Sequence, residues 1–223
     1  MTTVIGAVVS DFDRSLANIV GGYGGMFEIM SKHLDISTDE AKKIYEETKN
    51  HGGFSIQNLE GLLRKKGYRI DYEAFTSELR AWFSRVLAPY NDFGGPLVLA
   101  DSLGVPFVIV TCGNEDFQRE KVQAVGLSKH ELHIFPRQED RVAVIRRLVE
   151  KHGHVLYVDD RPYPLDMLRD NGLGADVVTT VHIVRHDGSG YENEQARYKH
   201  EVIQSLLELK KFIPKKGKGR KAA

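Results

Sequence analysis

Two carboxylates, Asp11 and Asp13, come directly after a short apolar run near the start of the chain. The run, residues 4–9, is rich in β-branched side chains and predicts a buried strand of a parallel sheet. Ligands and catalytic groups of open α/β sheets collect at the carboxyl ends of such strands. One carboxylate there can attack a substrate while the other moves a proton, and a Mg²⁺ ion can share the site. The alternative is a turn in which both side chains only accept backbone hydrogen bonds.

Polar residues also follow two later apolar runs. Residues 105–110 are followed by Thr111-Cys112-Gly113, and residues 155–158 are followed by Asp159-Asp160. The carboxyl ends of parallel strands meet at one edge of a sheet, so we expect these residues to gather beside Asp11 and Asp13.

The pattern between these runs predicts an α/β fold with one inserted segment. From residue 91 onward, strands alternate with helices, which is typical of a Rossmann-like parallel sheet with flanking helices. Residues 26–90 are helical throughout by apolar spacing, too long a stretch for one crossover, and they predict an inserted α-helical cap. The expected division is a core of residues 1–20 and 91–213, a cap of residues 21–90, and a disordered basic tail of residues 214–223. A closing helix is expected over residues 194–212.

Charge and composition limit the partners. The chain has 31 basic and 31 acidic residues, but its last 14 residues hold seven Lys and Arg and no acid. The acidic body argues against a nucleic-acid-binding core, so nucleic acid is left only to the tail, for which simple solvation is the favoured interpretation. No apolar run reaches the roughly 20 residues of a membrane span, and no signal-peptide pattern is present. One cysteine, Cys112, excludes an intrachain disulfide and agrees with the cytoplasm.

Taken together and in this order, the three strand ends resemble the haloacid dehalogenase (HAD) superfamily of phosphohydrolases. The family's first motif is Asp-x-Asp-x-Thr/Val after a strand, which Asp11-Phe12-Asp13-Arg14-Ser15 matches with Ser in place of Thr. Its second motif is a strand that ends in Thr or Ser, here Thr111. Its fourth is a strand that ends in two acids, here Asp159-Asp160. The resemblance spans about residues 4–185 and implies a HAD-like core.

The resemblance implies a role for each matched residue. Asp11 would be the nucleophile that forms an aspartyl-phosphate, and Asp13 would be the general acid and then the base for water. Thr111 would bind a phosphate oxygen, helped by the backbone N–H groups of Cys112 and Gly113. A Mg²⁺ ion would be held by Asp11, Asp160 and Asp159, together with the backbone carbonyl of Asp13.

Two positions depart from the family pattern. The third motif is a Lys or Arg that neutralises the phosphorylated aspartate, and Arg141 is the best-placed candidate, ahead of Arg137 and Lys151. The alternative is that Arg141 is a solvated residue at the start of a helix. The last acid of the fourth motif is displaced, because Asp166 falls one residue beyond the usual spacing; it either joins the site or only faces a helix.

These features predict a Mg²⁺-dependent phosphatase that acts on a small phosphorylated metabolite, since caps inserted at this point close over small substrates. Asp13 argues against a dehalogenase, whose motif lacks the second acid. The alternatives are a phosphomutase on the same site, a non-catalytic HAD-like binding module, and a nucleic-acid-associated protein anchored by the basic tail. The sequence identifies neither the substrate nor the oligomeric state.

Overall fold

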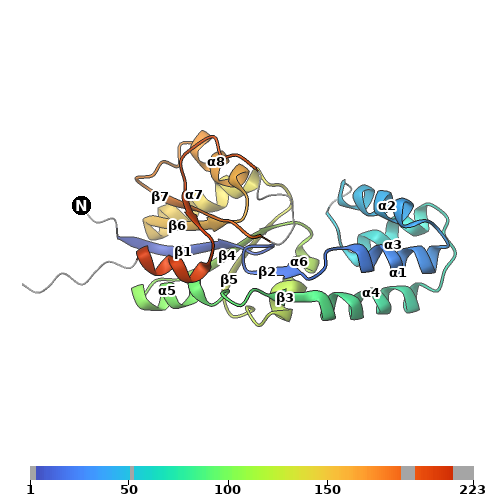
Figure 1. The fold of residues 1–223 in the computed structure, drawn as a ribbon. Helices are drawn as coiled ribbons and strands as arrows, with labels where there is room; N and C mark the ends of the chain where they lie inside the picture. Colours follow the sequence, from blue (N-terminus) through green and yellow to red (C-terminus); the bar gives the residue numbers. More distant parts are fainter. Residues whose placement is uncertain (1–3, 51–52, 187–193, 213–223) are drawn as a thin grey trace, which may run out of the picture. The chain divides into compact units, whose positions relative to one another are not determined.

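The structure, a computed structural model, describes residues 4–50, 53–186 and 194–212 (Figure 1). The chain divides into two compact units. The first comprises Met1–Asp11, Asn91–Val108 and Val142–Ala223, and the second comprises Phe12–Tyr90 and Ile109–Arg141. Each unit is described below by itself. The expected boundaries of core and cap stay a prediction, and the expected tail, residues 214–223, lies outside the described residues.

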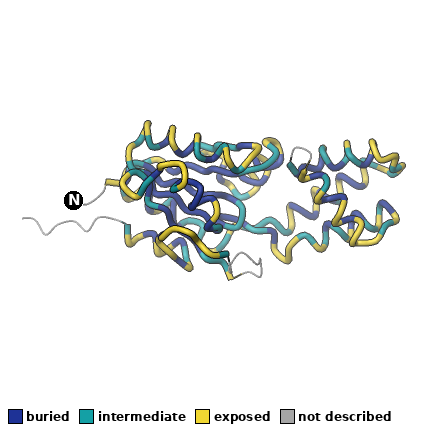
Figure 2. Tube along the Cα trace, turned by 90° about the horizontal axis from the view of Figure 1, so that it is seen from above, coloured by how far each residue is buried: buried dark blue, intermediate teal, exposed yellow. Residues whose placement is uncertain are grey.

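A six-stranded sheet with the order β5-β4-β1-β6-β7-β8 runs through the fold. Its strands are β1 (Ile5–Asp11), β4 (Phe107–Cys112), β5 (Glu131–Phe135), β6 (His154–Asp159), β7 (Val178–Ile183) and β8 (Glu201–Ile203). β1 pairs in parallel with β6, β6 with β7, and β7 with β8. The central strands are buried on both faces, which explains their continuous apolar runs (Figure 2). The predicted α/β class is therefore confirmed.

Helices cover the strands of the first unit. Figure 1 shows α7 (Asp140–His152) and α8 (Pro162–Asp170) on one face, with α5 (Gly95–Leu103) and the 3₁₀ helix η2 (Leu206–Phe212) on the other. α5 packs against both β1 and η2. Gly6 of β1 lies so close to the end of α7 that an added Cβ would sit 1.7 Å from the His152 carbonyl oxygen. Only glycine lets the strand pass at this point.

The second unit holds the helical insertion. It contains β2 (Ala17–Ile19), α1 (Gly24–Leu34), α2 (Thr38–Asn50), α3 (Ile56–Lys65), α4 (Tyr72–Val86), β3 (Leu87–Pro89) and α6 (Glu115–Ala124). Side chains of Ser55 and Asp71 cap the N-termini of α3 and α4 by accepting backbone hydrogen bonds. The chain enters and leaves the insertion through β2 and β3, which pair as an antiparallel ribbon.

One hydrophobic cluster joins the four inserted helices, and it includes Phe117 of α6. The Phe117 ring lies 5.4 Å from that of Phe54 and 5.0 Å from that of Phe83, in edge-to-face geometry. Such aromatic pairs contribute about 0.5–1.5 kcal/mol each beyond the area they bury. α6 is therefore held to the insertion by its own aromatic side chain.

The expected closing helix over residues 194–212 is wrong. The chain there forms β8 and η2, and the residues before β8 run without regular structure. The backbone N–H groups of Arg197 and Tyr198 donate to the Asp166 carboxylate instead of to a helical carbonyl. β8 then pairs with β7, so tertiary hydrogen bonds replaced the helix that local spacing favoured. Among the described residues, no helix has both the length and the hydrophobicity that a membrane crossing requires.

Candidate active site

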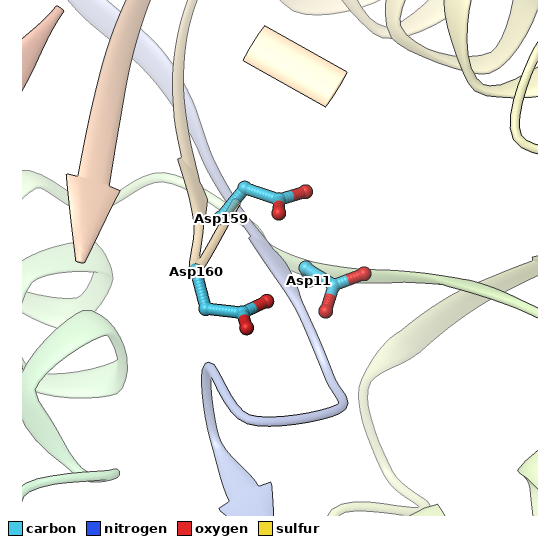
Figure 3. Close-up of side chains that lie close together, drawn as sticks. All are labelled: Asp11, Asp159 and Asp160. Atoms are coloured by element: carbon cyan, nitrogen blue, oxygen red, sulfur yellow. The ribbon is translucent and has the colours of Figure 1, made fainter. Parts of the chain in front are cut away.

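Three buried carboxylates lie together at the carboxyl ends of β1 and β6 (Figure 3). Asp11 is the last residue of β1, Asp159 is the last residue of β6, and Asp160 follows it. They are 6%, 1% and 7% exposed, and one oxygen of each lies within 4.8 Å of the others. The parallel pairing of β1 with β6 brings these side chains together as predicted from the strand ends.

Neighbouring groups fix the orientation of Asp159. The hydroxyl of Tyr157 donates to one carboxylate oxygen, and the backbone N–H of Arg161 donates to the other at 3.0 Å. Tyr157 precedes Asp159 by two residues on the same strand, so both side chains share one face of the sheet. The Asp159 carboxylate is thus held in place from two sides.

His182 of β7 supports the turn that carries Asp160. Its Nε2 lies 3.1 Å from the backbone carbonyl oxygen of Asp160, a contact that requires the hydrogen to be on Nε2. Burial lowers the pKa of His182 and outweighs the hydrogen bond to the Asp160 carbonyl, which favours the charged form. The imidazole therefore acts here as a neutral donor that fixes the backbone at Asp160.

The donor set suits a hard divalent cation. Mg²⁺ prefers carboxylate and carbonyl oxygens and usually takes only one or two carboxylates while it keeps several waters. Asp11, Asp159 and Asp160 offer three carboxylate oxygens at a shared point, two of them from one strand end. Three carboxylates this close also repel one another, and a bound cation relieves that repulsion. The residues present therefore fit a divalent cation, and Mg²⁺ is one that such oxygen ligands bind.

Asp13 lies in the second unit, where two side chains of α6 hold it. The Nζ of Lys121 is 2.5 Å from one carboxylate oxygen, and the Nε2 of Gln118 is 2.9 Å from the other. The Asp13 side chain is 41% exposed, whereas that of Lys121 is only 6% exposed. The prediction that the Asp13 carbonyl binds a metal stays a prediction.

Neither Gln118 nor Lys121 was identified from the sequence. A usable signal existed, since Lys121 falls in the buried stripe of α6 with Phe117 and Val122. Lysine is almost never fully buried unless it is paired. A lysine at an apolar position of a predicted helix therefore indicates a buried acidic partner.

Thr111 is buried in β4, and its hydroxyl has no hydrogen-bond partner among the described residues. A buried hydroxyl without a hydrogen-bond partner costs free energy. A hydroxyl in this state is better explained by a ligand that it would bind than by a structural role. The predicted part of Thr111 in phosphate binding stays a proposal, and this hydroxyl supports it.

Gly113 differs from its predicted part in phosphate binding, whereas the part of the Cys112 N–H stays a prediction. The N–H of Gly113 donates to the Phe135 carbonyl at 2.9 Å, so this amide is already engaged within the second unit. Cys112 offers its carbonyl, which accepts from Gln118 at 2.8 Å. Gly113 has φ of +145°, and an added Cβ would lie 2.8 Å from the Gln118 amide nitrogen. The glycine is needed there to make room for Gln118.

The three candidates for the third motif differ in burial. Arg141, in the first turn of α7, is 2% exposed, and its guanidinium lies 5.3 Å from the centre of the Phe135 ring. Arg137 has a largely exposed side chain and pairs with Asp140 at 3.1 Å. Lys151 lies in the last turn of α7. Arg141 is therefore not a solvated residue, so that alternative is wrong, and its assignment to the third motif stays a prediction.

Asp166 serves the fold. Its carboxylate accepts from the N–H groups of Arg197 and Tyr198 at 2.9 and 3.1 Å, and it lies 2.9 Å from the Nε2 of His200. Burial alone raises the pKa of Asp166, but these hydrogen bonds bring it below its ordinary value. The group of three carboxylates does not include Asp166.

Arg14 has a backbone conformation that glycine adopts more readily. The backbone at Arg14 has φ of +63°, a left-handed conformation that side chains other than glycine rarely adopt. Its N–H donates to the Ala17 carbonyl at 2.6 Å and closes the turn between Asp13 and β2. Glycine suits this position without strain, and arginine holds it here at some conformational cost.

Comparison with solved structures identifies the fold. A protein from Burkholderia xenovorans LB400 that carries the description haloacid dehalogenase-like hydrolase has 18% identity, with 92% of this chain and 94% of that chain covered and a TM-score of 0.64. A HAD phosphatase from Thermococcus onnurineus has 20% identity, coverage of 93% and 97%, and a TM-score of 0.60. A predicted phosphoglycolate phosphatase from Haemophilus somnus has 13% identity, coverage of 95% and 99%, and a TM-score of 0.61.

This chain therefore has the haloacid dehalogenase-like fold, as its motifs predict. Similar structures also include an L-2-haloacid dehalogenase and a protein described as a beta-phosphoglucomutase from Thermotoga maritima. No family model matches the sequence, and no curated protein matches it. Similarity at these identities establishes the fold, so the function has to be argued from the residues of the site.

Proposed function

We propose that the protein is a Mg²⁺-dependent phosphatase that hydrolyses a small phosphorylated metabolite through a phosphorylated aspartate. The observation that carries the proposal is the gathering of Asp11, Asp159 and Asp160 at one strand edge, all buried. A second acid, Asp13, follows the proposed nucleophile by two residues and is partly exposed. This combination supplies a nucleophile, a proton carrier and a set of metal ligands from only two strand ends.

In the first step, a carboxylate oxygen of Asp11 attacks the phosphorus of the ester. The bond between phosphorus and the leaving oxygen breaks, and that oxygen takes a proton from the Asp13 carboxyl group. In the second step, Asp13 takes a proton from water, whose oxygen attacks the phosphorus of the aspartyl-phosphate. Inorganic phosphate leaves, and the Asp11 carboxylate is restored.

Charge compensation supports both steps. Asp11, Asp159 and Asp160 would hold the Mg²⁺, which supplies positive charge that lowers the repulsion between carboxylates and a phosphoryl group. Tyr157 and the Arg161 N–H keep Asp159 oriented for that purpose. The Thr111 hydroxyl would donate to a phosphate oxygen, and Arg141 is the cation assigned to the phosphorylated state.

The test is phosphate release from a panel of small phosphorylated metabolites, with Mg²⁺ and with EDTA. We expect release only with Mg²⁺, and we expect Asp11→Asn to lower kcat by at least ~10³-fold, as for removal of a catalytic nucleophile. Asp101→Asn is the matched control, because Asp101 is an exposed acid on α5. Retained activity in folded Asp11→Asn would contradict the mechanism.

A phosphomutase is the second candidate, because the same carboxylates can carry a phosphoryl group between two hydroxyls of one sugar. The similar structure described as a beta-phosphoglucomutase makes this comparison relevant. The two activities differ in the fate of the phosphoryl group. Release of inorganic phosphate supports the phosphatase, whereas transfer within a hexose phosphate without release supports the mutase.

A non-catalytic binding module is a further alternative, because the involvement of Asp166 in the fold leaves the fourth motif one acid short. The missing acid weighs less because Asp11, Asp159 and Asp160 already offer three ligand oxygens. The same panel separates the two. A folded protein that binds Mg²⁺ and releases no phosphate from any compound would favour the binding module.

A further inference from the structure

Two side chains of one helix turn hold the two carboxylate oxygens of Asp13. Lys121 and Gln118 are three residues apart on α6, so they lie on the same face of that helix. Lys121 Nζ is 2.5 Å from Oδ1 of Asp13, and Gln118 Nε2 is 2.9 Å from Oδ2. With both oxygens held from one helix, the plane of the carboxyl group is fixed.

The surroundings of Lys121 leave its ammonium little choice of position. Its side chain is 6% exposed, and Nζ lies 5.7 Å from the centre of the Phe12 ring and 5.3 Å from that of Phe117. Both rings attract a cation through their faces. Burying an ammonium is costly unless a partner compensates, and Asp13 is the carboxylate within reach. An ordinary surface ion pair would not need this arrangement.

Gln118 links Asp13 to the residues that follow β4. The same amide nitrogen donates to Asp13 and to the Cys112 carbonyl at 2.8 Å, and Gly113 leaves the space that Gln118 occupies. The Gln118 side-chain oxygen has no hydrogen-bond partner among the described residues. One side chain thus ties the proposed proton carrier to the segment that contains Thr111.

We propose that Lys121 and Gln118 are positioning residues for Asp13, and that they keep its carboxyl group oriented toward the leaving oxygen of the ester. The proposal rests on the proposed function, since it needs Asp13 to deliver a proton. It predicts a defect that depends on how much the leaving group needs that proton, which a purely structural role for the pair would not produce.

The experiment compares kcat/KM for two aryl phosphates. Phenolate is a strong base with a pKa near that of tyrosine, about 10, so phenyl phosphate needs a proton donor. 2,4-Dinitrophenolate is a far weaker base and leaves without one. Because kcat/KM reports the steps up to departure of the leaving group, hydrolysis of the phosphorylated aspartate does not enter the comparison.

We expect Lys121→Met to lower kcat/KM for phenyl phosphate by ~10²-fold and for 2,4-dinitrophenyl phosphate by less than ~3-fold, within the range of general acid catalysis. Lys121→Arg, which keeps a cationic donor, should recover part of the loss. Gln118→Leu should show the same selectivity and carries the test if Lys121→Met does not fold. Arg119→Met is the matched control, because Arg119 is an exposed cation on the same helix, paired with Glu115.

Asp13→Asn provides the reference for interpretation. If Asp13→Asn and Lys121→Met both show the leaving-group dependence, the proposal is supported. If only Asp13→Asn shows it, the positioning role is overturned and the proposed function stands. If Asp13→Asn slows both esters equally, or if the wild type releases no phosphate, the role of Asp13 fails and the positioning proposal fails with it.

Discussion

At the scale of single residues, two buried threonines of the strands differ in what their hydroxyls do. Thr180 on β7 bonds to the Nδ1 of His200 and accepts from the guanidinium of Arg169, both at 2.8 Å. Thr111 on β4 has a hydroxyl without a partner among the described residues. The bonds of the first hydroxyl contribute to the stability of the fold, whereas burial of a hydroxyl without a partner costs free energy.

Replacing each threonine by valine separates these roles. Thr111→Val should leave the melting temperature unchanged or slightly raised, because it removes a buried polar group that makes no bond. It should weaken inhibition by inorganic phosphate about tenfold, the equivalent of ~1.4 kcal/mol. Thr180→Val, the matched control, should cost about 1–3 kcal/mol of stability, because it leaves polar partners behind.

Thermal unfolding and phosphate inhibition measure the two effects. A loss of stability in Thr111→Val with unchanged phosphate inhibition would remove Thr111 from the proposed site.

The site residues that could be predicted are those marked by a local pattern in the sequence. Asp11, Asp159 and Asp160 each end an apolar run, and parallel pairing of those runs is enough to bring them together. Lys121 and Gln118 meet Asp13 across more than a hundred residues of sequence, and no local pattern specifies that approach. The engaged N–H of Gly113 also depends on the approach of Phe135 in β5, which no local pattern specifies.

At the scale of elements, Asp166 fastens the segment before β8 to α8. It accepts two backbone hydrogen bonds and contacts His200, while Arg197 pairs with Asp170 at 2.5 Å. Two backbone N–H groups of this segment, those of Arg197 and Tyr198, are therefore satisfied by a carboxylate and not by helical carbonyls. The predicted helix failed for this reason, whereas strands with continuous apolar runs were predicted within a few residues of their ends.

The hydrogen bonds that Asp166 accepts should make part of the free energy of unfolding depend on pH. The pKa of Asp166 in the folded protein lies below its ordinary value, despite the opposing effect of burial, because of the N–H groups and His200. Its stabilisation is therefore complete above the unfolded pKa of about 3.9 and is lost as the pH falls through the folded pKa. We expect Asp166→Asn to cost about 1–3 kcal/mol at neutral pH.

Urea unfolding of wild type and Asp166→Asn at a series of pH values checks this expectation. The difference in free energy of unfolding should persist down to about pH 5 and shrink below about pH 4. Asp101→Asn, the exposed control on α5, should show no comparable difference. If the difference in free energy of unfolding grew on acidification, it would contradict this stabilising role of Asp166.

At the scale of the whole chain, the three carboxylates join parts that are far apart in the sequence. Asp11 comes from the first strand, and Asp159 and Asp160 come nearly 150 residues later. A ligand that binds only the folded arrangement stabilises it by mass action. Metal binding should therefore appear in the global unfolding transition, independently of any catalytic assay.

We expect Mg²⁺ at 100 times its dissociation constant to stabilise the wild type by about 2.7 kcal/mol, a rise in Tm of roughly 5–10 °C. Asp160→Asn should abolish the rise. In EDTA, the same variant should be no less stable than wild type, because it removes one of three negative charges that lie close together. Differential scanning calorimetry with Asp101→Asn as control measures both; an undiminished rise in Asp160→Asn would contradict the assigned site.

The ribbon of β2 and β3 has a consequence for how such a chain diversifies. Ile19 and Leu87 are paired across it, so the inserted helices begin and end at neighbouring points, about 4.8 Å apart as for any two paired strands. Because the ends of the inserted segment are neighbours, the helices between β2 and β3 can be replaced by another segment while both strands are kept. Replacement of the inserted helices would then leave the carboxylates of β1 and β6 in place.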